Sequence, residues 1–200
     1  MIARDGRPAG SVYTHVSDST RGRGTSPDAH PEPAREIHAV ASTTMRLATT
    51  REGGFRIDTG GGDAPLVADP EGEGWEVRQG PDGPRWKLTR DGSYPGGFLL
   101  RGSQGGGPAR TTREAACEGP PSNLLAPDGR LFRVVRRGAA VTRFELTGWE
   151  VPGAYLVAHP DESGFEIART DAGRELDLAA EILILFAAEI VEAVSADARG

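Results

Sequence analysis

Short stretches of alternating apolar and polar residues follow one another along the chain from Met45 onward. Trp75-Glu-Val77-Arg78 and Trp86-Lys-Leu88-Thr89 both alternate with a period of two, and Pro81-Asp82-Gly83 lies between them. That period places alternate side chains on opposite faces of a strand, and Pro, Asp and Gly are the residues that form tight turns. The two stretches therefore predict a β-hairpin.

The same reasoning predicts ten to twelve strands at a spacing of roughly 8–12 residues, a pattern typical of a sandwich or barrel. The stretch 102–122, rich in Gly, Pro and Thr, is expected to form a loop. The other predicted strands are residues 45–50, 55–57, 66–68, 97–100, 123–126, 131–135, 141–146, 149–151, 154–158 and 165–167.

One tetrad recurs along the chain. Gly74-Trp-Glu-Val77 is repeated as Gly148-Trp-Glu-Val151, and Gly164-Phe-Glu-Ile167 is similar. Two Trp tetrads 74 residues apart are the pattern that a duplicated half-barrel would leave, although a match of four residues also arises by chance.

The C-terminal segment departs from this alternation. Residues 176–194 contain neither Gly nor Pro and are rich in Leu, Ala and Glu, which favour helix. Asp177, Glu181, Glu189 and Glu192 fall within an arc of roughly 120°, and the rest of the circumference is apolar. We therefore expect one hydrophobic helix, within 174–196 and capped by Asp171 or a neighbour, that is packed in or against the barrel.

The acidic stripe of this helix allows two arrangements, since an unpaired buried charge is costly. In one, inward-pointing arginines on nearby strands pair with the acids. In the other, the stripe faces solvent through an incompletely closed barrel, and this arrangement is favoured because it needs no buried ion pair. The arginines in question are Arg133, Arg136, Arg137 and Arg143.

Residues 1–44 differ from the rest of the chain. They contain one aromatic residue, Tyr13, and show neither a strand period nor a helix period. Such a segment cannot bury enough apolar surface to offset its chain entropy. We expect a disordered tail or a misassigned start, followed by a single barrel domain over 45–200.

Composition narrows the class of protein. The net charge of −6, from 23 Lys and Arg against 29 Asp and Glu, argues against nucleic acid as the partner. A single cysteine, Cys117, excludes a disulfide framework and a cysteine-built zinc site. The longest uncharged apolar run, Ile182 to Ala188, is too short to span a membrane, and no secretory signal is visible. We expect a soluble, cytoplasmic protein.

The sequence predicts no catalytic, cofactor-binding or metal-binding residue. His159 is interpreted as a turn residue before Pro160 rather than a base that works with Asp161 or Glu162, and Cys117 lies between two acids, which blunts a thiol. Two glycine clusters, 60–62 and 105–107, lack the Lys-Ser/Thr and the helix of a phosphate loop. The acid pairs Asp161-Glu162 and Glu71/Glu73 receive no role.

Two further sets of side chains are candidates for a role: a cluster of arginines and the aromatic residues of the strands. Arg130, Arg133, Arg136 and Arg137 form the one basic concentration, but an alternating strand places Arg133 and Arg137 on one face and Arg136 on the other. The aromatic residues at alternating strand positions are expected to form the core against the helix. They are Trp75, Trp86, Phe98, Phe132, Phe144, Trp149 and Phe165.

A run of short strands that ends in one apolar helix resembles the tubby C-terminal-like superfold. Within that group the chain is most similar to LURP-one-related and phospholipid scramblase-like proteins. Residues 123–135, 144–151 and 176–194 carry the likeness, which is one of architecture over about 45–196. It implies an antiparallel barrel of about twelve strands threaded by its last helix.

Three functions remain open. The first is a non-enzymatic interaction or regulatory module that binds an unidentified protein partner. The second is a scramblase-like module with peripheral membrane contact, although recognition of anionic lipid needs clustered Lys and Arg. The third is an enzyme with a site built from Asp, Glu and Arg, because a fold does not fix a function. The oligomeric state is left open, since the helix could also pair two subunits.

Overall fold

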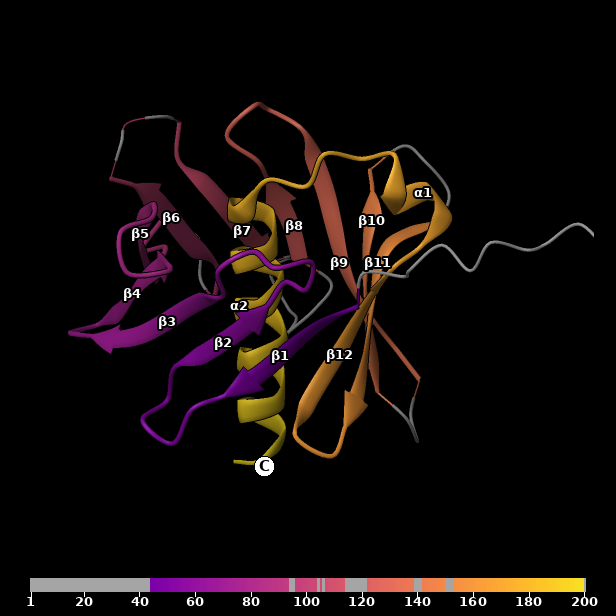
Figure 1. Ribbon diagram of the computed structural model, residues 1–200, viewed down its shortest axis with the longest axis horizontal. Coiled ribbons are helices and arrows are strands. Elements are labelled where there is room, and N and C mark those ends of the chain that lie inside the picture. Colours follow the sequence, from indigo (N-terminus) through magenta and orange to yellow (C-terminus); the bar gives the residue numbers. More distant parts are fainter. Residues whose placement is uncertain are drawn as a thin grey trace, which may run out of the picture. The chain divides into compact units, whose positions relative to one another are not determined.

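Twelve antiparallel strands close into one barrel in the computed structural model (Figure 1). Neighbours in sequence are neighbours in the sheet, and β1 pairs with both β2 and β12. The predicted fold class, an antiparallel barrel of 10–12 strands with a C-terminal helix, is confirmed. The strands are β1 Met45–Thr49, β2 Phe55–Asp58, β3 Leu66–Glu71, β4 Gly74–Gln79, β5 Arg85–Arg90, β6 Phe98–Gly102, β7 Ala109–Arg113, β8 Ser122–Leu125, β9 Leu131–Arg137, β10 Arg143–Gly148, β11 Ala154–Asp161 and β12 Gly164–Arg169.

The chain divides into two units, residues 1–38 and 39–200, and the barrel belongs to the second. The structure describes residues 44–93, 96–103, 105, 107–113, 122–138, 142–149 and 153–199. The predicted tail, apart from residue 44, and Cys117 lie outside the described residues.

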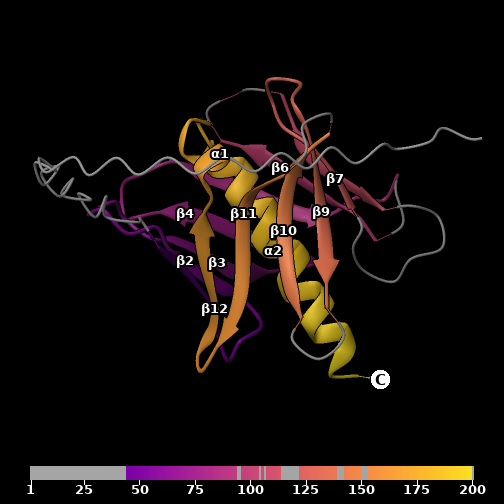
Figure 2. The ribbon, with the colours of Figure 1, turned by 90° about the vertical axis from the view of Figure 1, so that its right-hand side faces the viewer.

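Helix α2, Ala180–Asp197, runs through the barrel (Figure 2). Nine consecutive residues, 182–190, are buried. Because successive residues are about 100° apart around a helix, a buried run of this length leaves no side of the helix exposed. The helix therefore fills the lumen, which is one of the two arrangements, in or against the barrel, that its sequence pattern predicts.

This helix begins later than its sequence pattern indicates. A separate short helix, α1 Asp171–Arg174, comes first, and the side chain of Thr170 caps it by accepting the backbone N–H of Gly173 at 3.2 Å. Residues 175–179 then cross the barrel end in non-helical conformation. The guanidinium of Arg130 holds the carbonyl oxygen of Asp177 through two 3.1 Å hydrogen bonds, which takes that carbonyl out of a helical ladder.

The pairing register of the barrel repeats every four strands. We call β3–β6 repeat I, β7–β10 repeat II, and β11, β12, β1 and β2 repeat III. Each repeat places a buried phenylalanine at the same position of its fourth strand, and the residue two places further on is also buried and apolar. Phe98, Phe144 and Phe55 lie opposite Arg90, Arg136 and Thr49, while Leu100, Leu146 and Ile57 lie opposite Leu88, Val134 and Leu47.

Repeats I and III also share sequence. Residues 66–77 and 156–167 are identical at six of twelve aligned positions. Both segments form a hairpin of the same register, with Pro70 opposite Trp75 and Pro160 opposite Phe165. Of the two interpretations of the Gly148 tetrad, the register favours a chance match over a duplicated half-barrel, because Gly148 ends strand β10 whereas Gly74 begins strand β4.

Strand β7 lies within the stretch 102–122, which the sequence predicts to be a loop. Its inward side chains are Ala109, Thr111 and Arg113, so the apolar alternation that marks the other strands is weak here. Repeat II is polar at three inward positions where the other repeats are apolar. Thr111, Arg113 and Ser122 take the places of Ala68, Pro70 and Trp75 in repeat I and of Ala158, Pro160 and Phe165 in repeat III.

These three polar residues bind the one acid of α2 that is completely buried. The carboxylate of Glu189 accepts hydrogen bonds from the hydroxyls of Thr111 and Ser122, both at 2.6 Å, and from the guanidinium of Arg113 at 3.2 Å. The barrel is closed, so the favoured arrangement with the acidic stripe facing solvent is wrong. A buried carboxylate is tolerated here because it has three donors.

Two further acids of the stripe, Glu181 and Glu192, also meet the wall, whereas the side chain of Asp177 is exposed. Glu181 accepts the indole N–H of Trp86 at 3.0 Å, and Glu192 accepts a 2.6 Å hydrogen bond from Arg90. Three of the four arginines proposed for this role pair with other acids. Arg136 reaches the lumen but pairs with Asp197, and Arg137 and Arg143 flank Glu145 on the outer surface.

Candidate functional site: the Trp149 groove

The two most exposed large apolar side chains among the described residues lie together at the end of the barrel where α2 begins. Leu131 is 46% exposed and Trp149 is 53% exposed. The backbone N–H of Trp149 donates to the carbonyl of Leu131 at 3.3 Å, and in repeat I the N–H of Ser103 donates in the same way to Arg85 at 2.9 Å. Leu131 and Trp149 thus occupy the positions that the polar residues Arg85 and Ser103 occupy in repeat I.

Two hollows meet at this point of the wall. One has a volume of about 330 Å³ and the other about 450 Å³, and both include Gly129 and Leu131 in their lining. We call the two hollows together the Trp149 groove. The first is also lined by Arg130, Phe132, Gly148, Trp149, Tyr155 and Leu176, and the second by Gly107, Pro108, Arg110, Thr112, Asn123, Leu125, Ala126 and Pro127.

The wall of the first hollow is aromatic and held rigidly. The rings of Phe132 and Tyr155 meet edge to face with centroids 6.1 Å apart, and the Arg130 guanidinium lies 5.7 Å from the Phe132 centroid. Gly148 allows this packing, because a Cβ there would lie 2.7 Å from the Tyr155 hydroxyl. A rigid aromatic wall costs little conformational entropy when a partner binds.

The turn between β8 and β9 positions Arg130. Gly129 adopts a φ of 87°, which favours glycine, and its N–H donates to the carbonyl of Ala126 at 3.0 Å. Asp128 accepts the backbone N–H of Arg130 at 3.0 Å and its Nε at 2.6 Å. These contacts, the backbone hydrogen bond above all, hold the pKa of the Asp128 carboxyl below its ordinary value. Arg130 is therefore part of the wall rather than a mobile cation.

Most of the aromatic residues lie where the alternation predicts. Trp86, Phe98, Phe132 and Phe144 are buried, and Trp75 and Phe165 are partly buried against the same core. Trp149 is the exception, and its assignment to the core is wrong. It follows Gly148, which lies opposite the buried Phe132, so the alternation of β10 places Trp149 on the outer face. Its predicted strand partners, residues 150 and 151, lie outside the described residues.

The histidine considered as a base makes no hydrogen bond or ion pair among the described residues, although the register places it opposite Glu166. His159 and Pro160 both belong to strand β11, so the interpretation of His159 as a turn residue is wrong. Asp161 is engaged by the backbone N–H of Ser163 at 2.7 Å and by Arg46 at 3.3 Å. Hydrogen bonds from the N–H and then the hydroxyl of Ser163, followed by the charge of Arg46, lower the pKa of the Asp161 carboxyl.

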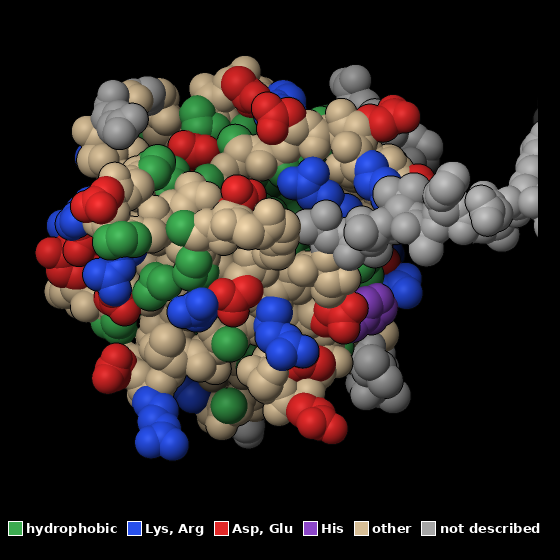
Figure 3. Space-filling view, in the orientation of Figure 1, with side chains coloured by type: hydrophobic (Ala, Val, Ile, Leu, Met, Phe, Trp, Pro, Cys, Tyr) green, Lys and Arg blue, Asp and Glu red, His purple; other side chains and the backbone are tan. Residues whose placement is uncertain are grey.

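The basic concentration does not form one patch. Phe132 and Val134 point into the barrel, so Arg133 and Arg137 point outward and Arg136 points inward, as the alternation predicts. Arg137 and Arg143 approach the carboxylate of Glu145 to 3.2 and 2.8 Å, which compensates part of their charge. On the face drawn in Figure 3, basic and acidic side chains are interspersed.

The glycine clusters and the acidic residue Glu71, which were the remaining candidates, lie in turns and strands of the described ranges. Gly60, Gly61 and Gly62 all adopt positive φ in the turn between β2 and β3, and Gly105 does so in the loop before β7. Glu71 ends β3 beside Lys87, 4.0 Å away. Within the part of the chain that the structure describes, no group of three or more His, Cys, Asp or Glu is arranged to hold a metal ion.

Comparison with protein-family models, with curated proteins and with solved structures yields no match. The resemblance to tubby-like barrels therefore stays a prediction. Among the described helices, none combines the length and the apolar character that crossing a bilayer requires.

Proposed function

We propose that this barrel is a non-enzymatic interaction module that binds a protein partner through the Trp149 groove. The observation that carries the proposal is the exposed Leu131–Trp149 pair, which lies on a groove of rigid aromatic residues. Trp is among the residues that dominate binding energy at interfaces, where such anchors fit well-packed pockets. In repeat I the equivalent residues, Arg85 and Ser103, are polar, so the apolar pair is not a requirement of the fold.

The occupied lumen supports a role for the outer wall. Helix α2 fills the barrel along residues 182–190 with apolar side chains and one fully bonded carboxylate. A closed sheet also lacks free edge strands, so a partner cannot bind by extending the sheet. Recognition then depends on side chains in grooves of the wall.

Peptide display against the full chain tests the proposal. We expect selected peptides to carry an apolar anchor and to lose at least about 30-fold in affinity when Trp149→Ala or Leu131→Glu is introduced, which corresponds to about 2 kcal/mol. Val194→Ser, at the opposite end of the barrel, is the matched control and should bind normally. Failure to select any peptide, or binding that is equal in wild type and Leu131→Glu, would contradict the proposal.

A further inference from the structure

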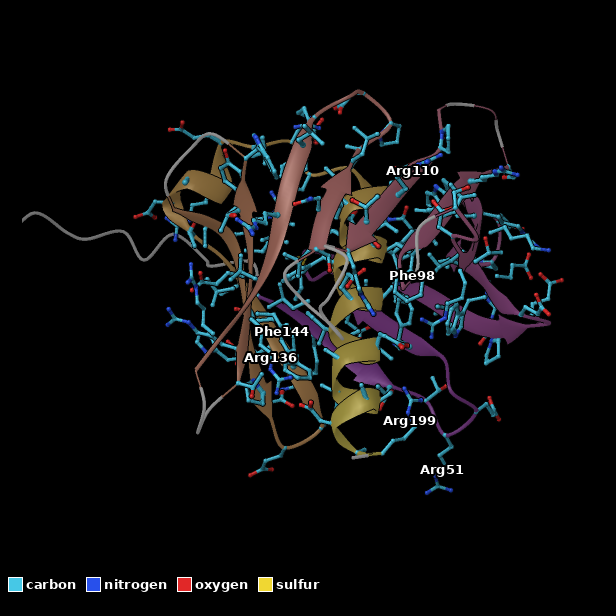
Figure 4. All side chains as sticks on the ribbon, turned by 180° about the vertical axis from the view of Figure 1, so that it is seen from behind. Arg51, Phe98, Arg110, Arg136, Phe144 and Arg199 are labelled. Carbon is cyan, nitrogen blue, oxygen red and sulfur yellow. The ribbon has the colours of Figure 1, made fainter. Side chains whose placement is uncertain are left out.

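The three repeats present three equivalent wall positions near the end of the barrel where α2 finishes. In each case the position lies opposite the repeat's buried phenylalanine. Repeats I and II carry arginine there, Arg90 and Arg136, and repeat III carries Thr49. Figure 4 shows the labelled Phe98 and Phe144 on either side of the helix.

Both arginines close their part of the barrel by pairing with the helix. Arg90 donates to Glu192 at 2.6 Å, and its guanidinium also lies 5.1 Å from the Phe98 centroid. Arg136 donates twice to Asp197, at 2.6 and 3.0 Å. A long side chain and a carboxylate thus fill the gap between wall and helix in repeats I and II.

In repeat III neither member of such a pair is present. Thr49 is short, and the helix presents Val191 and Val194 in place of an acid. A pocket of about 280 Å³ opens between helix and wall, and we call it the Val194 pocket. Its lining is mainly apolar, from Leu47, Pro160, Phe165, Val191 and Val194, with Thr49, Asp161 and Gly164 completing it.

The size and chemistry of this pocket indicate a ligand. An apolar cavity of about 150 Å³ is large enough to bind benzene, and ligand pockets commonly begin near 300 Å³. Val194 is 38% exposed, so the pocket can be reached from solvent. The one charged group in the lining, Asp161, is already bound by the Ser163 N–H and by Arg46.

We infer that the Val194 pocket binds the hydrocarbon group of an uncharged small molecule, such as a straight alkyl chain that ends in a hydroxyl. The apolar walls favour the chain, and the Thr49 hydroxyl at the margin suits a neutral polar head. An anionic head would face the carboxylate of Asp161. A cationic head would find the carboxylate of Asp161 already paired with Arg46. This inference does not depend on the Trp149 groove.

Methyl NMR of the full chain, titrated with 1-octanol, tests the inference. We expect saturable shifts of the Val191, Val194 and Leu47 methyl signals. Octanoate and octylammonium at neutral pH should bind at least about tenfold more weakly, a difference of about 1.4 kcal/mol. Absence of saturable shifts up to the solubility limit of octanol, or shifts confined to the Trp149 groove, would overturn it.

Variants at Thr49 separate specific binding from general adsorption. Thr49→Arg introduces the residue of the other two repeats and should reduce octanol affinity at least about tenfold by filling the pocket. Thr49→Ser is the matched control and should bind within about twofold of wild type. Val194→Trp fills the same space from the helix and serves as a second blocking variant. Octanol shifts that persist unchanged in a folded blocking variant would overturn the assignment.

Discussion

The carboxylate of Glu189 accepts a 2.6 Å hydrogen bond from the hydroxyl of Thr111, and that hydroxyl accepts the backbone N–H of Phe98 at 2.9 Å. Glu189 belongs to the central helix, Thr111 to β7 and Phe98 to β6. Among the described residues, the register between these two strands covers only Leu99–Arg110 and Leu100–Ala109. The helix therefore helps to close the barrel at its shortest strand pairing, beyond filling the lumen.

This contact also fixes the orientation of the helix. A helix that is apolar on nearly every side could rotate or slide in an apolar lumen at little cost. The equivalents of these polar residues in repeats I and III are apolar, so Glu189 finds its three donors at only one of the three repeat positions. A single buried polar group can specify register in this way.

Replacing Glu189 by Gln should destabilise the protein strongly. The change removes the negative charge that compensates Arg113, whose side chain is 8% exposed, and breaking a buried pair typically costs about 3–5 kcal/mol. Urea unfolding measures the loss. Glu192→Gln is the control, because its partner Arg90 is 46% exposed, and it should cost about 1 kcal/mol or less. Equal losses for the two variants would contradict this account.

The barrel could be predicted from the sequence because most strands alternate visibly. Met45 and Leu47, or Trp86 and Leu88, place large apolar side chains inward with charged residues between them. Strand β7 could not be predicted in this way, because its inward residues are small or polar and its partner, Glu189, lies 78 residues from Thr111. A threonine can therefore be assigned to an inward strand position here only if the distant acid that it bonds is also known.

The Trp149 groove could not be predicted for a related reason. The pattern at 149–151 predicts a separate strand with Trp149 in the core, whereas the register sets Gly148 opposite the buried Phe132 and so places Trp149 on the outer face. The groove also needs Leu131, Tyr155 and Leu176, which come from three separate segments. One feature of the sequence does point to an exposed apolar residue at this place. Leu131 directly follows the Pro127–Arg130 turn, where an apolar residue is not required.

The two tryptophans at opposite extremes of burial should respond differently to substitution. Trp86 is 6% exposed and its indole N–H donates to Glu181, so Trp86→Ala should cost about 3–5 kcal/mol. Trp149→Ala should change stability by no more than about 0.5 kcal/mol, since the side chain is exposed. Chemical denaturation of both variants makes the comparison. A large loss for Trp149→Ala would show that it belongs to the core after all.

Gly74 should tolerate no side chain although its backbone needs no unusual φ. A Cβ there would lie 2.2 Å from the carbonyl oxygen of Leu88, and Gly164 has the equivalent approach to Leu47, also at 2.2 Å. Gly74→Ala must therefore push β4 away from β5, at a cost of about 1–3 kcal/mol in thermal unfolding. Gly92→Ala, with no atom within 4 Å of its Cβ, is the matched control and should be nearly neutral.

The ion pair between Asp197 and Arg136 should make the end of α2 sensitive to acid. The hydrogen bond from Arg136, with the attraction of its charge, lowers the pKa of the Asp197 carboxyl, while the pKa of an unfolded aspartate is about 3.9. A carboxyl whose pKa is lower in the folded state contributes stability above the unfolded value, and loses it as pH falls through the folded value. Carboxyl ¹³C NMR should therefore give Asp197 a lower titration midpoint than in Arg136→Gln, with faster amide exchange at Ala198 below that midpoint. Equal midpoints in the two proteins would show that the pair does not form in solution.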